Sequence, residues 1–163
     1  MATMARQMAR KVAKAPRTIY LVRQTQLLVY AEMVENLRAF GLTPVQYMVL
    51  SSSSNEDSPS SADLARRAQM TPQSMNELIA ALHKKGLVRR REHPDNKRIL
   101  QVALTKDGAR LLAQCERQID RMEQGFFRCF SEKELGMFRR LHSKLLHERR
   151  HASGKPGLSC KAA

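Results

Sequence analysis

The sequence has no long hydrophobic run, and this lack argues against several classes of protein. Its longest apolar stretches, such as Leu27–Ala31, fall far short of the roughly 20 residues that a membrane-spanning helix needs. The N-terminal residues 1–17 include five basic residues and no acidic one, but they lack the apolar centre of a secretory signal. We therefore expect a soluble protein that is neither exported nor bound to a membrane.

Cysteine is scarce, and no arrangement of chemically active residues suggests catalysis. Cys115, Cys129 and Cys160 are widely spaced and form no CxxC motif, which argues against a disulfide framework or a four-cysteine zinc site and favours a reducing cytoplasm. His147 and His151 have a metal-binding spacing but no third ligand nearby. Since no nucleophile elbow or phosphate-binding loop is present either, we predict no enzyme, no metal site and no cofactor.

Acidic residues are too few to balance the basic ones. The 163 residues include 29 Lys and Arg against 15 Asp and Glu, a formal net charge of +14. Such a charge attracts polyanions, either nucleic acid or an anionic membrane, and does not by itself choose between them. Residues 1–16 are expected to form a flexible basic arm, although organelle transit peptides have a similar composition. The apolar fraction of 42% is enough for one folded domain.

Long amphipathic helices are predicted at both ends of this domain. Thr18–Phe40 is apolar on more than one side and ends at Gly41, and Thr105 begins a second long helix. Ser131 and Glu134 form a capping box that begins a third. Together these helices present more apolar surface than one small lobe can cover, which predicts a homodimer. The apolar seam of the second helix consists of Leu112, Cys115, Ile119, Met122, Phe126 and Cys129. The tyrosines expected in the core are Tyr20, Tyr30 and Tyr47.

Three shorter helices and a hairpin are predicted between the long helices. Thr43 with Pro44 begins the first short helix, Ser51–Ser61 reads as a loop, and Ser60 with Asp63 caps a helix at Ala62–Ala68. Thr71 and Pro72 then begin a helix that ends near Gly86. One face of this helix is apolar, while its opposite face carries uncharged polar or small side chains at Gln73, Ser74, Asn76 and Ala80.

A basic β-hairpin follows this helix. Leu87–Glu92 and Ile99–Leu104 flank the turn-rich residues His93–Lys97, and the alternation in the second strand predicts that one of its faces is covered. Residues 84–98 include seven basic and two acidic residues. Helix, turn, capped helix and hairpin in this order indicate a winged helix-turn-helix, in which a helix reads bases in the major groove while Lys and Arg neutralise phosphates.

The run LARRAQMTPQSMNELIAALHKKGLVRRREHPDNKRILQVALTKDG, residues 64–108, resembles the MarR family of bacterial regulators in residue types and spacing. The resemblance covers about residues 16–150 and implies that the flanking helices dimerise. The family commonly carries Asp-Arg-Arg at the tip of the wing, where this chain has Asn96, Lys97 and Arg98. The family's minor-groove contact is therefore implied for Lys97, without the family's neighbouring carboxylate unless Asp95 substitutes for it. Redox-sensing relatives keep a cysteine in the first helix, where this chain has none.

The expected fold is mainly α with a small β hairpin, a winged helix-turn-helix lobe plus N- and C-terminal dimerisation helices. The domain spans residues 17–150, with the lobe at about 44–104, dimerisation helices at 17–40 and 106–150, and a disordered tail at 151–163. We expect the protein to bind a palindromic operator in double-stranded DNA. The predicted DNA contacts are Thr71, Gln73, Ser74, Asn76, Arg91, Asn96, Lys97 and Arg98.

The resemblance also implies a repressor that is released by a small aromatic carboxylate, a phenol or a coenzyme A thioester of such an acid. The candidate effector residues are Arg23 and either Arg89 or Arg90 as counter-charges, with Tyr30 as a stacking wall. The alternatives are a nonspecific architectural or RNA-binding protein, for which net charge alone would suffice, and an enzyme acting on nucleic acid. The uncharged polar face of Gln73, Ser74 and Asn76 favours base readout over both.

Overall fold

The computed structural model describes residues 16–54, 58–93 and 96–152. The predicted basic arm, except for its last residue, and most of the predicted tail lie outside these residues. Six helices and one hairpin follow each other along the chain in the predicted order. They are α2 (Thr18–Arg38), α3 (Pro44–Ser52), α4 (Ser61–Ala68), α5 (Pro72–Lys84), β1 (Val88–His93), β2 (Asn96–Leu104), α6 (Lys106–Phe126) and α7 (Glu132–Ala152).

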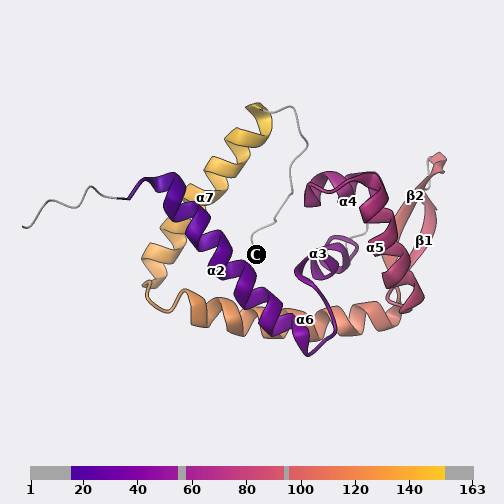
Figure 1. The fold of residues 1–163 in the computed structure, drawn as a ribbon, viewed down its shortest axis with the longest axis horizontal. Coiled ribbons are helices and arrows are strands. Elements are labelled where there is room, and N and C mark those ends of the chain that lie inside the picture. The colour runs from indigo at the N-terminus through magenta and orange to yellow at the C-terminus, as the bar shows by residue number, and fades with distance from the viewer. Residues whose placement is uncertain (1–15, 55–57, 94–95, 153–163) are drawn as a thin grey trace, which may run out of the picture.

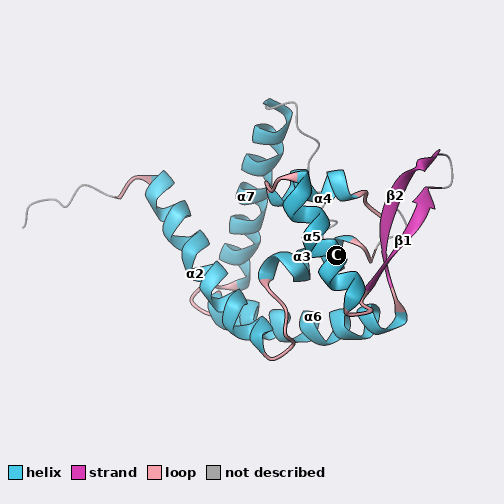
Figure 2. Cartoon of the chain, turned by 45° about the vertical axis from the view of Figure 1, so that its right-hand side comes forward, coloured by secondary structure: helices cyan, strands magenta, loops and turns pink. Residues whose placement is uncertain are grey.

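The long helices and the short ones form two distinct parts of the molecule. Helix α6 runs along the base, with α2 and α7 at one end and the lobe of α3, α4, α5 and the hairpin at the other (Figure 1). In the view turned by 45°, α2 and the hairpin still lie at opposite sides of the molecule (Figure 2). Because α6 packs against α2, α3 and β2, it connects the lobe to the helices at the far end.

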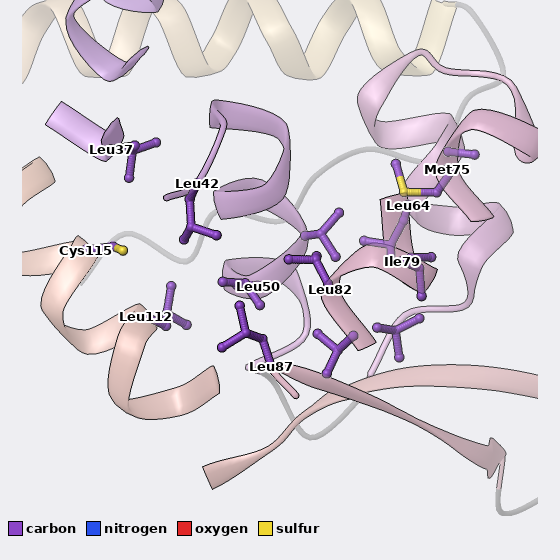
Figure 3. Close-up of a cluster of buried hydrophobic side chains, with 14 residues drawn as sticks. Leu37, Leu42, Leu50, Leu64, Met75, Ile79, Leu82, Leu87, Leu112 and Cys115 are labelled. Atoms are coloured by element: carbon purple, nitrogen blue, oxygen red, sulfur yellow. The ribbon is translucent and has the colours of Figure 1, made fainter. Parts of the chain in front are cut away.

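One hydrophobic core fills the lobe and continues onto α6. Leu50 of α3, Leu64 of α4 and Ile79 of α5 are fully buried within it, and Leu112 and Cys115 extend it along α6 (Figure 3). Each of these helices contributes one apolar stripe because its apolar residues recur three and four positions apart. The core therefore fixes α5 against the lobe by one face and leaves its other face outside.

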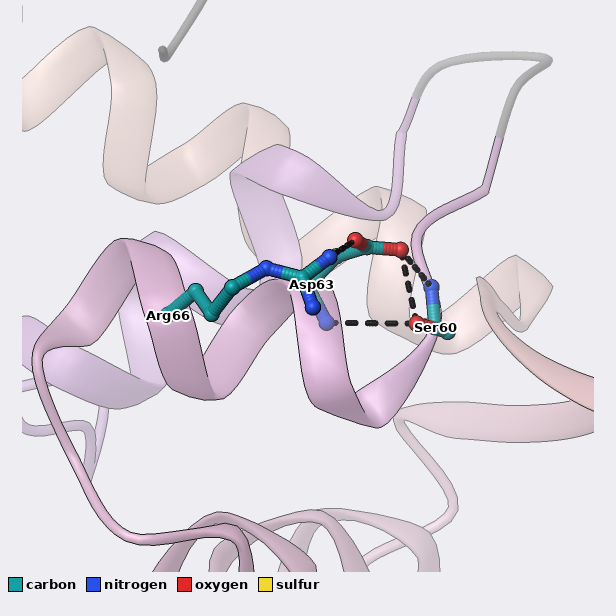
Figure 4. Close-up of polar contacts among 3 residues, drawn as sticks. All are labelled: Ser60, Asp63 and Arg66. Atoms are coloured by element: carbon teal, nitrogen blue, oxygen red, sulfur yellow. Dashed lines mark hydrogen bonds and ion pairs between the residues drawn. The ribbon is translucent and has the colours of Figure 1, made fainter. Parts of the chain in front are cut away.

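Side-chain caps begin the helices where the sequence predicts them. Thr43 and Gln46 form a full capping box, and so do Ser60 and Asp63, whose contacts with Arg66 are drawn in Figure 4. Burial alone would raise the pKa of Asp63, but hydrogen bonds from Ser60 and the nearby Arg66 guanidinium outweigh it and lower the pKa. The caps predicted at Thr71, Thr105 and Ser131 are also present.

The helix boundaries differ from the prediction by one or two residues. Helix α3 continues to Ser52 and so takes two residues from the predicted Ser51–Ser61 loop. Helix α7 extends through Ala152, so the first two residues of the predicted tail are helical. Gly41 and Gly86 end their helices with φ of +63° and +70°, as expected of glycine in this position. Gln69 ends α4 in the same left-handed region without being glycine.

Strand β1 is shifted by one residue from the prediction, β2 begins three residues earlier than predicted, and the strands are covered differently. They pair antiparallel from Val88↔Leu104 to His93↔Asn96, with an irregularity beside Glu92. The prediction of one covered face is wrong, because Gln101, Val102 and Ala103 are all buried while Leu100 is 47% exposed. The segment before α4 covers this part of β2. The Val102 amide donates a hydrogen bond to the Pro59 carbonyl, and Ser60 forms an isolated β-bridge with Gln101.

Two expectations about apolar packing are also wrong. Cys129 lies beyond the end of α6 and is exposed, whereas Cys115 is fully buried and its burial raises the pKa of the thiol. Tyr20 and Tyr30 are at least half exposed on α2 rather than in the core. Only Tyr47 packs against the core, where burial, followed by nearby acidic groups such as Glu116, raises the pKa of its phenol to about 12.

Candidate nucleic-acid interface

The N-terminal half of α5 presents its polar side chains outward. Met75 and Ile79 are fully buried on the core side, while Gln73 and Asn76 are exposed and Ser74 is partly exposed on the opposite side. This division follows from the helical period, since residues one and two positions away from a buried one point elsewhere. A helix held by its apolar face and displaying amide groups has the form needed to enter a major groove.

These polar groups bond to each other in the free protein. The Thr71 hydroxyl accepts from the Ser74 amide at 3.1 Å and donates to the Ser74 hydroxyl at 2.9 Å. The Gln73 amide nitrogen donates to a Glu77 carboxylate oxygen at 3.2 Å. Sequence reasoning passed over Glu77, although its place four residues after Gln73 was available as a signal. A carboxylate there repels phosphate and accepts from the amino groups of bases, so it limits where α5 can sit on DNA.

Arg90 lies beside this polar face rather than away from it. A pocket of about 310 Å³ is lined by Asn76 of α5, Ser61 of α4 and Arg90, Leu100 and Val102 of the hairpin. Sequence reasoning placed Arg90 with the effector residues. Its position next to Asn76 instead brings a guanidinium to the edge of the recognition surface, where it can reach a phosphate or a base edge.

Arg89 and Arg91 lie on the other face of the same strand. Successive side chains of a strand point to opposite sides, and both arginines line a pocket together with residues that follow α3 and residues of α6. The Arg91 guanidinium donates from Nε to the Gln101 side-chain oxygen at 3.0 Å. The structure thus separates Arg91 from Asn76, with which the sequence grouped it as a DNA contact.

At the tip of the wing, the structure describes the backbone of Asn96, Lys97 and Arg98. Asn96, Lys97 and Arg98 belong to β2, and Asn96 pairs with His93 across the hairpin. Their side chains and the whole of Asp95 lie outside the described residues. The phosphate and minor-groove contacts assigned to these residues therefore stay predictions.

The predicted effector residues do not come together within one chain. Arg23 and Tyr30 are exposed on α2, and Arg89 and Arg90 are exposed on β1. Helix α2 and the hairpin lie at opposite ends of the molecule in both views (Figures 1 and 2). A single small molecule therefore cannot touch all four side chains of one chain.

Two further searches concern metals and membranes. Within residues 16–54, 58–93 and 96–152, no three His, Cys, Asp or Glu side chains group closely enough to hold a metal ion. In the same part of the chain, no helix combines the length and the apolar character needed to cross a bilayer.

Comparisons with known proteins agree with this geometry. A model of the MarR family matches residues 42–100, from the start of the lobe to β2. The chain is 26% identical over 121 residues to YhbI, an uncharacterised HTH-type transcriptional regulator of Bacillus subtilis, covering 74% of this chain and 79% of YhbI. It is 29% identical over 126 residues to the HTH-type transcriptional repressor Rv2887 of Mycobacterium tuberculosis, covering 77% and 91%.

Solved structures share the fold over most of their length. The crystal structure of Rv2887 with p-aminosalicylic acid has a TM-score of 0.67 at 27% identity, covering 80% of this chain and 98% of that one. A variant of Escherichia coli MarR with operator DNA has a TM-score of 0.68 at 23% identity, covering 78% and 91%. CouR of Rhodococcus jostii RHA1 with p-coumaroyl-CoA has a TM-score of 0.72 at 20% identity, covering 79% and 91%.

The fold, the exposed polar face of α5 and the basic hairpin define a winged helix-turn-helix transcription regulator that binds DNA. The lobe matches the model of the MarR family over residues 42–100, and the relatives that the chain matches include HTH-type transcriptional repressors.

Proposed function

We propose that the protein is a homodimeric repressor that binds a palindromic operator and is released by a small aromatic acid, a phenol or a coenzyme A thioester. The observation that carries the DNA-binding part is the juxtaposition of Asn76 and Arg90. Asn76 of α5 and Arg90 of the hairpin line the same pocket at one edge of the lobe, which supports base reading by the amide with a guanidinium beside it. In this arrangement Thr71, Gln73, Ser74 and Asn76 face the bases, and Lys97 and Arg98 neutralise phosphates.

An unpartnered apolar surface supports the dimer. Exposed apolar side chains concentrate on α2 and α7, where a soluble monomer would be expected to cover them. The best occupant is a second copy of the same surface, because a two-fold dimer pairs one patch with itself. The side chains are Ile19, Tyr20, Leu21, Val22, Leu27, Leu28, Tyr30, Met137, Leu141, Leu145 and Leu146.

The effector class rests on what the relatives bind. Rv2887 has been solved with p-aminosalicylic acid and CouR with p-coumaroyl-CoA, and both ligands carry an aromatic ring and an anionic group. A chain with a net charge of +14 can attract such anions, and its basic side chains can supply the counter-charge. We propose the same class of effector for this protein.

A competition assay tests the proposal against nonspecific binding. Labelled operator, obtained by selection from random duplexes, is competed with unlabelled random DNA at salt concentrations between roughly 50 and 200 mM. We expect Asn76→Ala and Gln73→Ala each to cost about 1–3 kcal/mol on the operator and little on random DNA. Lys97→Ala and Arg98→Ala should weaken both and lower the salt slope by about one unit each.

Footprinting provides the geometric control. A two-fold dimer should protect paired half-sites whose centres lie roughly 10–10.5 bp apart. Equal proportional losses for Asn76→Ala and Lys97→Ala on every sequence would remove the recognition role of α5. The protein would then be a nonspecific architectural binder, for which its net charge would be sufficient.

A further inference from the structure

One acidic side chain lies on the polar face of α5. Glu77 is exposed and follows Gln73 by four residues, so the two side chains are neighbours on the same side of the helix. Among the residues that the structure describes, no Lys or Arg side chain forms an ion pair with Glu77. An unpaired carboxylate that faces DNA weakens binding to every sequence, because it repels phosphate. Its presence on this face therefore calls for a contact that attraction to phosphate does not supply.

The hydrogen bond between Gln73 and Glu77 leaves each side chain with free polar atoms. Gln73 Nε2 donates to Glu77 Oε1 at 3.2 Å. A glutamine amide has two N–H donors and an accepting oxygen, so Gln73 keeps one donor and its acceptor, the two groups that match the edge of adenine. Glu77 keeps its second carboxylate oxygen, which can only accept. The pair thus presents two different hydrogen-bonding patterns side by side.

The rest of this face leaves room for bases near Glu77. Ala80 and Ala81 follow Glu77 by three and four positions, are exposed and carry only a methyl group, so the middle of α5 can approach the floor of a groove. The basic residues of the helix, His83 and Lys84, lie in its last turn. Glu77 therefore lies between the amide-bearing first turns and the basic last turn, over base edges rather than beside the phosphates.

The chemistry of a carboxylate selects the base. In the major groove only cytosine and adenine present an amino group, and adenine also presents the N7 acceptor beside it, which repels a carboxylate. Four residues of helix span about 6 Å, and successive bases of one strand are about 3.4 Å apart. We propose that Glu77 determines specificity by accepting a hydrogen bond from N4 of a cytosine, within about two base pairs of the base that Gln73 reads.

This contact discriminates mainly by exclusion. Guanine or thymine at the same position would place a carbonyl oxygen, O6 or O4, against the Glu77 carboxylate, and two acceptors that face each other repel. The cost of the carboxylate is then largest on wrong sequences and is offset on the correct one. A recognition helix with Glu77 therefore gives up affinity for random DNA and gains discrimination between sequences.

This inference rests on the proposed function, because it assigns a base contact to the recognition helix. Operators are selected from random duplexes with the unmodified full chain, and binding of all variants is then measured at one salt concentration. We expect the unmodified protein to select a cytosine at one position of each half-site, and thymine there to weaken binding about tenfold. For Glu77→Gln, whose amide also donates, the same change of base should alter affinity less than about threefold.

Matched variants separate the contact from charge and from the hydrogen bond to Gln73. Glu116→Gln removes the same charge from an exposed position on α6 and should keep the full preference for cytosine. Gln73→Ala should relax the preference at a different, nearby position. Because Glu77 is exposed and glutamine has the same shape, Glu77→Gln should keep the Tm of the unmodified protein.

Modified bases test the hydrogen bond itself. N4-methylcytosine still pairs with guanine, but a methyl group replaces the amino hydrogen that faces the major groove, whereas 5-methylcytosine keeps this hydrogen and adds a methyl group beside it. We expect N4-methylcytosine at the selected position to weaken the unmodified protein about tenfold, and 5-methylcytosine to weaken it less. Glu77→Ala, which has no acceptor, should bind the N4-methylated and unmethylated duplexes alike.

The outcomes separate this inference from the proposed function. If Glu77→Gln strengthens binding to every sequence by the same factor as Glu116→Gln, Glu77 acts by charge alone and the contact is refuted. If Glu77→Gln and Gln73→Ala relax the same position, Glu77 only positions Gln73, and the contact is again refuted. Selection of adenine, guanine or thymine at the position that depends on Glu77 overturns the assignment of cytosine. If the unmodified protein selects no sequence at all, the proposed function itself fails.

Discussion

The lobe of α3, α4, α5 and the hairpin covers its own apolar side chains, whereas α2 and α7 leave theirs open. Leu64, Ile79 and Leu82 are fully buried in the lobe, but Ile19 on α2 is 76% exposed and Leu141 on α7 is 60% exposed. Both regions carry apolar side chains on their helices, and they differ in whether one chain supplies the opposing surface. The lobe is therefore stabilised within the chain, and we propose that the helices at the far end are stabilised by association with a second copy.

The largest expected effect comes from the lobe. Replacing Ile79 by Ala removes three buried carbons from the centre of the core, which should lower the free energy of unfolding by about 2–5 kcal/mol. Urea titration followed by circular dichroism measures this loss. Leu28→Ala is the matched control, since Leu28 is 59% exposed on α2. If Leu28→Ala were as costly as Ile79→Ala at every protein concentration, the contrast between the two regions would be wrong.

The second-largest expected effect concerns the exposed apolar surface of α2 and α7. Leu141→Asp places a charge in the apolar surface of α7 and should weaken the dimer by about 2 kcal/mol or more, as for a residue near the centre of an interface. Light scattering at micromolar concentration should give twice the 18.6 kDa of one chain for the unmodified protein and a lower mass for the variant. If the unmodified protein remained a monomer at this concentration, the proposed homodimer would be refuted.

The lobe and the long helices meet at Gly108, and this junction can be tested separately. A Cβ at Gly108 would lie 1.9 Å from the Leu87 carbonyl oxygen, so the first turn of α6 must move away from the hairpin root. We expect Gly108→Ala to destabilise the fold by about 1–3 kcal/mol. Gly125→Ala is the control, because nothing lies within 4 Å of its Cβ position in the same helix. It should be neutral or stabilise α6 by up to about 1 kcal/mol.

Features encoded by neighbouring residues were predictable from the sequence. The caps at Thr43, Ser60, Thr71 and Thr105 and the glycine at the end of α5 depend on side chains within three or four positions of the helix end. The resemblance to a known family then supplied the order in which these elements pack. For these reasons the fold class and the winged helix-turn-helix were correct.

Features that depend on distant segments were not predictable in the same way. The burial of Gln101 results from the segment before α4, where Ser60 lies 41 residues away, and the exposure of Cys129 results from the end of α6 at Phe126. The separation of Arg89 from Arg90 had a local signal, since adjacent residues of a strand face opposite sides. Which of these faces meets α5 follows only from the packing of the hairpin, and so the pocket that Asn76 and Arg90 line is known only from the structure.

The smallest expected effect concerns the cap of α4 inside the lobe. The hydrogen bonds from Ser60 and the charge of Arg66 hold the pKa of Asp63 below its ordinary value of 3.8, despite the opposing effect of burial. A carboxyl whose pKa is lower in the folded state contributes stability above its unfolded pKa and loses it as pH falls through the folded pKa. Asp63→Asn keeps the shape of the cap and removes the titration. The difference in Tm between the unmodified protein and Asp63→Asn should therefore be largest near neutral pH and shrink below pH 3.8. Calorimetry over this range measures the difference, in which the other carboxyl groups largely cancel. A difference that stays constant from neutral to acid pH would mean that the Asp63 carboxylate contributes no charge-dependent stability, and that the amide of Asn caps α4 equally well.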